Sequence, residues 1–190
     1  MKIYLETDRM ILREITLQDE DIILDLDSDP EVMKYLTNGK PSSIDEVRDY
    51  LKRTVTLLKK HNGKLGFWVV YSKESKQFMG WFHFRPSKSD PENVKRIELG
   101  YRFLKKFWGF GYATEGSLAL VKKGFEELDI EEVFAVTMEK NIGSQKVMKK
   151  VGLQFVRKFV SPDFPDSKEF DVEYAIDKKK WLKVELISQS

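Results

Sequence analysis

A strand, a glycine-bearing turn and the start of a helix follow one another in the segment 98–115. Gly109 and Gly111 supply the turn, because glycine adopts positive φ and has no Cβ to block an approaching group. The first N–H groups of a helix have no partner within the helix, and the helix dipole favours an anion at that end. With the lysine pair 105–106 beside it, this segment predicts a cradle for a pyrophosphate.

Two familiar phosphate motifs do not fit this segment. A P-loop requires Gly-x₄-Gly-Lys followed by Ser or Thr, and the chain has no such run. A dinucleotide fingerprint requires a third glycine three residues after Gly111, where Thr114 stands, and the next glycine, Gly116, is out of phase. The Gly-x-Gly pair alone is a weak signal, so its value comes from the strand before it and the helix after it.

The composition excludes several classes of protein. The 190 residues, 41% of them hydrophobic and 34% charged, are typical of one globular domain, which we expect over 1–190. The longest apolar run, 67–71, is far shorter than the roughly 20 residues that cross a bilayer, so no membrane association is expected. A net charge of +2 gives no sign of a nucleic-acid partner. The lack of cysteine excludes disulfides and a cysteine-linked acyl intermediate, and with no leader visible at 1–6 we expect a cytoplasmic protein.

Hydrophobic periodicity and capping signals predict the other elements. A capping box at Thr16-Leu17-Gln18-Asp19 begins a helix that ends near Asp29-Pro30, and Ser42–Glu46 begins a second helix that runs to about Lys60. The expected strands cover 9–15, 67–72, 77–85, 94–103, 133–137, 155–160 and 170–176, and further helices are expected over 112–128 and 142–150. Strand groups with helices between them predict an α/β (α+β) sheet layered by helices.

Four segments of the chain resemble one known family. Residues 101–115, with Trp108-Gly109-Phe110-Gly111-Tyr112-Ala113-Thr114-Glu115 at their centre, resemble the acetyl-CoA loop of the GNAT N-acetyltransferases. The segments similar to the ribosomal-protein N-terminal (alanine) acetyltransferase branch are 6–13, Asn141-Ile142-Gly143-Ser144 with 150–153, and Glu173–Ile176 with Trp181. The resemblance covers nearly the whole chain. It implies a mixed, mostly antiparallel sheet of about seven strands, flanked by helices and splayed in the middle to admit acetyl-CoA.

The resemblance also implies roles for individual residues. The residues expected to bind the cosubstrate acetyl-CoA are Tyr101, Phe103, Lys106, Trp108, Gly109, Phe110, Gly111, Tyr112, Ala113 and Asn141. Lys106 stands where the family has Gln or Arg, so it keeps a donor but lacks the fork of an arginine. Trp81 and His83 lie on a strand expected to face the amine acceptor. The segments expected to shape the acceptor pocket are 19–36, 42–60 and the loop 161–168.

Acetyl transfer to an amine requires a base, because an ammonium has no lone pair. Glu98 is the candidate base, and His83 is a second one because its pKa suits neutral pH. Ser144 is the candidate proton donor to the leaving thiolate, since Met148, at the position of the tyrosine acid of many family members, cannot donate a proton. A backbone N–H of 99–101 is expected to bind the oxyanion. No cluster of His, Asp and Glu has the spacing of metal ligands, so no metal is expected.

The expected function is therefore acetyl-CoA-dependent N-acetyl transfer to a protein N-terminus or a small-molecule amine, by direct attack in a ternary complex. Two other classes stay open, a non-catalytic CoA-binding sensor or scaffold and a nucleotide-binding protein that uses the same cradle. Glu98 also fits one exposed member of an alternating strand, and Ser144 and Asn141 also fit helix caps. The acceptor, and the choice between a monomer and a homodimer, are open.

Overall fold

The computed structural model of the chain describes residues 2–37, 39–160 and 169–188. Its strands are β1 (Ile3–Glu6), β2 (Met10–Glu14), β3 (Gly66–Ser72), β4 (Phe78–Pro86), β5 (Arg96–Phe103), β6 (Glu132–Met138), β7 (Gln154–Val160) and β8 (Phe170–Asp177). Its helices are α1 (Glu20–Ser28), α2 (Pro30–Met33), α3 (Ile44–Lys60), α4 (Tyr112–Glu127), α5 (Ile142–Lys150) and α6 (Lys178–Ser188), with short 3₁₀ turns η1 (Leu17–Asp19) and η2 (Lys105–Phe107). The loop 161–168, which we expected beside the acceptor pocket, lies outside the described residues.

The strands form one sheet in the order β1-β2-β3-β4-β5-β6-β8-β7. The neighbouring pairs are antiparallel except β5 and β6, which are parallel and are joined through α4. The expected mixed, mostly antiparallel sheet is therefore confirmed. The sequence predicted about seven strands, and the eighth is β1, a short edge strand whose Tyr4 ring stacks on Trp68 at 4.0 Å between centroids.

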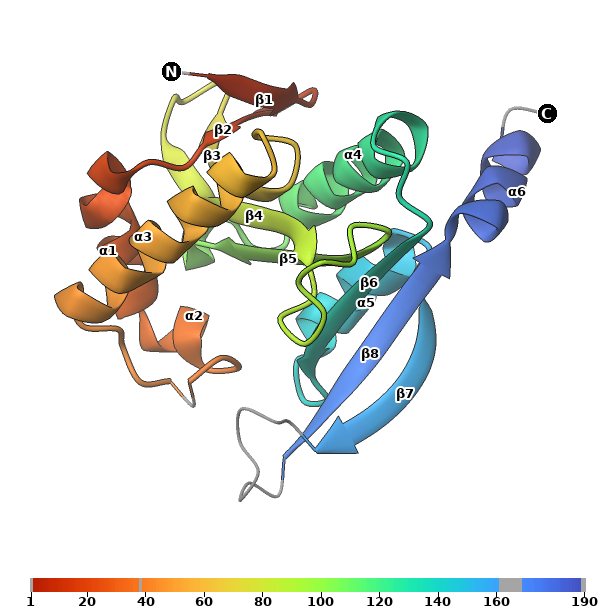
Figure 1. The fold of residues 1–190 in the computed structure, drawn as a ribbon. Helices are drawn as coiled ribbons and strands as arrows, with labels where there is room; N and C mark the ends of the chain where they lie inside the picture. The colour runs from red at the N-terminus through yellow and green to blue at the C-terminus, as the bar shows by residue number, and fades with distance from the viewer. Residues whose placement is uncertain (1, 38, 161–168, 189–190) are drawn as a thin grey trace.

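The two faces of the sheet carry different helices. Figure 1 shows α1, α2 and α3 on one face, and α4 and α5 on the other. The apolar run 67–71 is explained by this arrangement, because β3 is buried on both sides. Phe67 and Val69 pack with the core under α1 and α3, whereas Trp68 and Val70 belong to the core under α4. The first of these faces, with α3 over part of it, is called the α3 face below.

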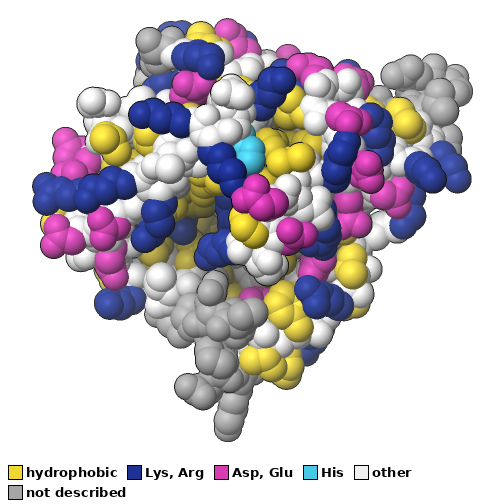
Figure 2. Space-filling model, in the orientation of Figure 1, with side chains coloured by type: hydrophobic (Ala, Val, Ile, Leu, Met, Phe, Trp, Pro, Cys, Tyr) yellow, Lys and Arg dark blue, Asp and Glu magenta, His cyan; other side chains and the backbone are white. Residues whose placement is uncertain are grey.

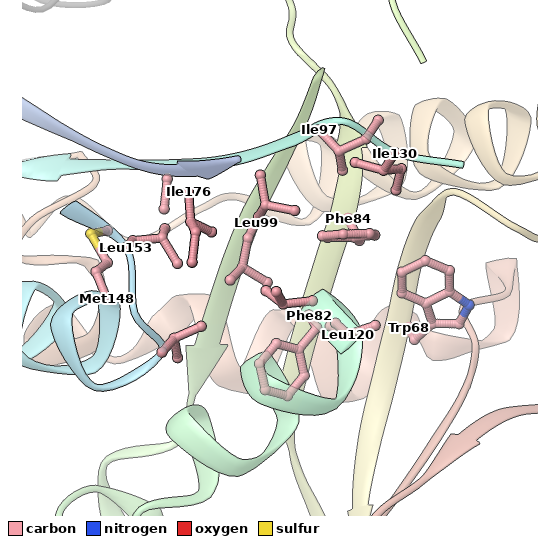
Figure 3. Close-up of a cluster of buried hydrophobic side chains, with 14 of the residues drawn as sticks. Trp68, Phe82, Phe84, Ile97, Leu99, Leu120, Ile130, Met148, Leu153 and Ile176 are labelled. Carbon is pink, nitrogen blue, oxygen red and sulfur yellow. The ribbon is translucent and has the colours of Figure 1, made fainter. Parts of the chain in front are cut away.

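The larger core joins α4 to the centre of the sheet. Phe82 and Phe84 of β4 and Leu120 of α4 lie in one hydrophobic cluster in Figure 3, and all three side chains are fully buried. Met148 of α5 lies in the same core with 2% of its surface exposed. In the described part of the chain, no helix has both the length and the apolar character that crossing a bilayer requires.

Both predicted capping signals are present. Thr16 and Asp19 form the capping box of η1, which continues into α1. Ser43 caps α3, since its Oγ accepts from the Glu46 N–H at 3.2 Å and the Glu46 carboxylate accepts from the Ser43 N–H at 2.7 Å. These caps begin the helices that cover the α3 face.

Candidate active site

The turn between η2 and α4 is an exposed loop whose glycines have left-handed backbone. Gly109 has φ +84° and Gly111, the N-cap of α4, has φ +83°. The first hydrogen bond of the helix runs from the Glu115 N–H to the Gly111 C=O at 3.0 Å, so the N–H groups that precede Glu115 have no acceptor within the helix. A Cβ on Gly109 would meet nothing within 4 Å, and one on Gly111 only Arg9, at 3.6 Å. The loop is thus an open row of donors of the kind that binds phosphate.

Arg9, on the turn before β2, fixes the shape of this loop. Its Nε donates to the Glu115 carboxylate at 2.6 Å, and one terminal nitrogen donates to the Phe110 C=O at 3.0 Å. Its guanidinium also lies over the Tyr112 ring, 4.3 Å from the centroid. Burial alone would raise the pKa of Glu115, but hydrogen bonds from Thr7 and Arg9 outweigh it and lower that pKa. Sequence reasoning missed Arg9, because nothing local pairs a residue near the N-terminus with a helix so far along the chain.

The other predicted loop residues surround this row of donors. The Trp108 indole N–H donates to the Phe103 C=O at 2.7 Å, while 43% of the Trp108 surface and 63% of the Phe110 surface stay exposed. The Lys106 ammonium donates to the Gln77 side chain at 3.0 Å, just before β4. The loop therefore presents aromatic surface to solvent, and Lys106 reaches toward β4.

The sheet opens immediately before the loop. The parallel register of β5 and β6 joins Arg96, Ile97 and Glu98 to their partners and goes no further, although β5 continues to Phe103 and β6 to Met138. The expected splay is therefore present. Backbone groups alternate in direction along a strand. Because the Leu104 N–H donates to Met79 at the β4 side, those of Phe103 and Tyr101 face the opening.

The N-terminus of α5 brings Tyr101, Asn141 and Ser144 together. The Asn141 side-chain oxygen accepts from the Ser144 N–H at 3.1 Å, so Asn141 caps the helix. The Ser144 Oγ lies 3.0 Å from the Tyr101 hydroxyl. Burial raises the pKa of Tyr101 to about 12, against the opposing hydrogen bond with Ser144, so the phenol stays protonated. Met148 is one turn further along α5, in the core, and offers no proton.

Glu98 lies on the α3 face, where β5 leaves β6. Its carboxylate is 2.7 Å from Arg85 and 3.7 Å from Nε2 of His83, both on β4. Burial alone would raise the pKa of Glu98, but the adjacent His83 side chain and the charges of Arg85 and Lys88 lower it to about 2. Glu98 is therefore ionised at any pH near neutral, and a carboxylate of so low a pKa is a weak base.

Trp81 and His83 stand beside Glu98 on the same face. Their rings are stacked at 5.6 Å with an interplanar angle of 23°, and Phe67 lies edge-on to His83 at 5.2 Å. A Cβ on Gly100 would lie 2.4 Å from the His83 ring, so the imidazole covers Gly100 and only glycine fits there. The two predicted acceptor residues therefore lie beside the part of β5 that is no longer paired with β6, which is called the mouth of the splay below.

Four polar atoms at or near Trp81 are buried without a hydrogen-bond partner among the described residues: the Trp81 Nε1, the His83 Nε2, the Arg102 Nε and the Tyr50 hydroxyl. Arg102 lies over the Trp81 ring at 4.9 Å and pairs with Asp27 of α1. The Tyr50 ring, on α3, is 6.3 Å from that of Trp81. Figure 2 shows this side of the molecule hollowed between α3 and the segment 87–95, with hydrophobic and Lys or Arg side chains on its floor. The Trp81 Nε1 and the Arg102 Nε are therefore hydrogen-bond donors without an acceptor on this side of the sheet.

Comparison with known proteins decides the family. The model of the acetyltransferase (GNAT) domain matches residues 9–154, which include the loop, the splayed strands and the start of α5. The chain belongs to the GNAT acetyltransferase family. This GNAT protein is 34% identical over 192 residues to the FsC-acetyl coenzyme A-N(2)-transacetylase of Aspergillus fumigatus, covering 95% of this chain and 79% of that protein.

Solved structures agree on the fold. A GNAT acetyltransferase from Bacillus anthracis superimposes with a TM-score of 0.78 at 23% identity, covering 94% of this chain and 99% of that one. RimL, a ribosomal L7/L12 alpha-N-protein acetyltransferase in complex with coenzyme A, gives a TM-score of 0.76 at 15% identity, covering 93% and 98%. The GNAT chain described here is thus an N-acetyltransferase by family and by fold.

Proposed function

We propose that this chain transfers an acetyl group from acetyl-CoA to a primary amine, by direct attack in a ternary complex. The observation that carries the proposal is the continuity of the opening between β5 and β6 with the row of free N–H groups at the start of α4. A diphosphate fits the row, and an extended chain that bonds the N–H groups of Tyr101 and Phe103 fits the opening. The chain has no cysteine, which excludes a cysteine-linked acyl intermediate.

The predicted cosubstrate residues of the loop and of the start of α5 support this proposal, whereas Lys106 donates to the Gln77 side chain. The N–H groups of 109–113 hold the diphosphate, and the exposed rings of Trp108 and Phe110 lie beside it. Asn141 uses its side-chain oxygen on Ser144, which leaves its NH₂ group for the amide chain of the cosubstrate. Acetyl-CoA supplies a thioester, an acyl group activated toward an amine, and we propose that the backbone N–H of Leu99 or Tyr101, on the side of β5 that faces the opening, binds the oxygen of that carbonyl. We propose one catalytic domain over 1–190, working in the cytoplasm without a metal.

We further propose that the acceptor amine carries an oxygen-bearing group beside it, as an α-amine carries its carbonyl. The Trp81 and Arg102 nitrogens can only donate, and a buried donor without an acceptor is costly. A carbonyl of the acceptor would satisfy them. The names of the two relatives above, an N(2)-transacetylase and an alpha-N-protein acetyltransferase, also describe transfer to amines of this type.

Alanine amide and isopropylamine test the acceptor, because they differ in a carboxamide that replaces one methyl group. We expect kcat/KM for alanine amide to be at least tenfold higher at equal concentration of neutral amine, and we would add spermidine and an aminoglycoside to the panel. A thiol reagent measures the release of free CoA without background, since the protein has no thiol.

Three results of this panel contradict parts of the proposal. Equal kcat/KM values for alanine amide and isopropylamine would show that the buried donors do not bind the carbonyl of the acceptor. Binding of acetyl-CoA without release of CoA for any amine would favour the sensor or scaffold. A larger thermal shift with ATP or NAD than with CoA would favour a nucleotide-binding protein, because a specific ligand raises the melting temperature by mass action.

Ser144→Ala tests the proposed proton donor to the thiolate. We expect kcat to fall about tenfold at pH 7, with the affinity for acetyl-CoA nearly unchanged, and the loss to shrink above the thiol pKa of about 8.5, where the thiolate needs no proton. Tyr101→Phe, which removes the phenol bonded to Ser144 and keeps the ring, should give a smaller loss of the same form. An unchanged kcat for Ser144→Ala at every pH would leave Ser144 with a structural role only.

A further inference from the structure

The transfer requires a base, and Glu98 is a poor one although its carboxylate is ionised. An α-ammonium has a pKa near 7.7, and the pKa of the Glu98 carboxyl is lowered from its ordinary value, so moving the proton to Glu98 is unfavourable. The Arg85 guanidinium, 2.7 Å from the carboxylate, holds Glu98 in its charged form. Another group at the mouth of the splay must take the proton, unless bulk water does.

His83 occupies the right position for that role. Its ring covers Gly100, two residues after the last β5 residue paired with β6, so the imidazole lies where the opening for the cosubstrate begins. It faces the hollow side of the sheet that carries Trp81 and the unpartnered donors. The ring is fixed between Trp81, Phe67 and the Gly100 backbone, and 12% of its side chain remains exposed.

The two ring nitrogens of His83 have different surroundings. Nε2 is buried without a hydrogen bond and faces the Glu98 carboxylate at 3.7 Å. Nδ1 takes part in no hydrogen bond within the described residues. A carboxylate next to one nitrogen favours the proton there and stabilises the charged ring, which leaves the lone pair on the other nitrogen. This is the arrangement that a histidine base requires.

We propose that His83 is the catalytic base, that its Nδ1 takes the proton of the acceptor amine, and that Glu98 is a positioning residue facing Nε2. This rests on the proposed N-acetyl transfer. Nδ1 accepts one proton from the ammonium, and the freed lone pair of nitrogen forms the C–N bond to the carbonyl carbon of the thioester. The C–S bond breaks with its electron pair on sulfur, and the second amine proton goes to that thiolate through the Ser144 hydroxyl. His83 then returns its proton to solvent.

The charges around His83 agree with a neutral ring at pH 7. Burial lowers its pKa, the Arg85 charge lowers it further, the Glu98 carboxylate opposes both, and Arg102 of β5 adds a small lowering. These are the charged groups that face the ring from β4 and β5, while Phe67 of β3 contributes only an aromatic edge. The imidazole is therefore deprotonated, and ready to accept, at every pH above about 6.5.

His83→Gln tests the base, and His61→Gln is its matched control, since the chain has two histidines and His61 lies at the end of α3. With alanine amide as acceptor, we expect His83→Gln to lose about 100-fold in kcat/KM at pH 7 but less than tenfold at pH 9.5, where the amine is already neutral. In the parent, kcat/KM should fall on the acid side with an apparent pKa below 6.5. In His83→Gln, this apparent pKa should rise to the pKa of the amine. His61→Gln should stay within threefold of the parent at every pH.

A uniform loss at all pH values in His83→Gln, with the limb unmoved, would overturn the proposal and leave His83 a structural residue. So would an unchanged profile, which would assign the proton to water. The melting temperature and the acetyl-CoA affinity of each variant show whether it is folded. If the parent protein acetylates no amine, the proposed function itself fails, which is distinguishable from the loss of one base in an active enzyme.

Nitrogen-15 NMR of the two histidine rings tests the proposal without any acceptor, with His61→Gln giving the assignment. We expect His83 to carry its proton on Nε2 and to titrate below pH 6.5. Glu98→Gln should lower that pKa further and reduce kcat/KM about tenfold. Glu132→Gln, which removes a carboxylate paired with Arg96 on the neighbouring strand, should change neither value. A proton on Nδ1 as the main tautomer in the parent protein would overturn the assignment.

Discussion

Gly111→Asp should lower the affinity for acetyl-CoA by more than 100-fold, whereas Gly111→Asn should lower it by less than tenfold. Position 111 has φ +83° and caps α4. Asn and Asp tolerate this left-handed conformation better than other residues with a side chain, and the two have nearly the same shape. The Cβ of either one meets only Arg9, at the ordinary contact distance of 3.6 Å. The two variants therefore differ chiefly in one negative charge.

The size of the effect follows from Coulomb's law. Two unit charges about 5 Å apart repel by about 3 kcal/mol at an effective dielectric constant of about 20, and this is more than a factor of 100 in a binding constant. Calorimetric titration with acetyl-CoA measures both variants. Gly39→Asp is a further control, because Gly39 has φ +80° and lies before α3, away from the loop. If the Asp and Asn variants at position 111 bind acetyl-CoA alike, the diphosphate does not lie on these backbone groups.

The sequence allowed the acetyl-CoA loop to be predicted because its signal is local. Gly109, Gly111 and the following helix stand together in the chain, and the structure gives both glycines the positive φ that the turn requires. The capping box of Thr16 and Asp19 is local in the same sense, and it is confirmed. Short-range patterns of this kind decide backbone conformation, so the order of elements followed from local sequence, whereas the splay between β5 and β6 was implied only by the resemblance to the GNAT family.

The contacts that tune the site are not local, and the sequence did not reveal them. Arg9 bonds to Glu115, which lies 106 residues further along the sequence. Arg85 stands opposite Glu98 only because the register of β4 and β5 aligns them, and the connection 87–95 does not fix that register by propensity. The sequence therefore led to the prediction of Glu98 as the base but gave no sign of the Arg85 guanidinium that lies 2.7 Å from its carboxylate. The prediction that Glu98 is the base was therefore made without knowledge of its pairing with Arg85.

Asp19→Asn should lower the free energy of unfolding by about 3 to 5 kcal/mol at pH 7, the cost of leaving a buried charge without its partner. Asp19 is 4% exposed, and its carboxylate accepts two hydrogen bonds from Arg13 of β2, at 2.5 and 2.9 Å. It also accepts from the Thr16 N–H at 2.7 Å, a bond that an asparagine oxygen can keep. The variant thus removes the charge and one of the two acceptors of Arg13. Urea unfolding measures it, and Asp49→Asn, in an exposed pair with Lys52, should change stability by less than about 1 kcal/mol.

The pH dependence of this variant has a definite sign. Burial alone would raise the pKa of Asp19, but the hydrogen bonds from Arg13 and Thr16 outweigh it and lower that pKa below its unfolded value near 3.9. A depressed pKa stabilises the fold above the unfolded pKa, and this stability is lost as the pH falls through the folded pKa. The stabilities of the parent and of Asp19→Asn should therefore converge only as the pH falls through this lowered pKa. Adding Arg13→Met should recover part of the loss at pH 7, because no buried charge is then left unpaired. A double variant as unstable as Asp19→Asn alone would show that packing, and not the unpaired guanidinium, sets the cost of disturbing this buried pair.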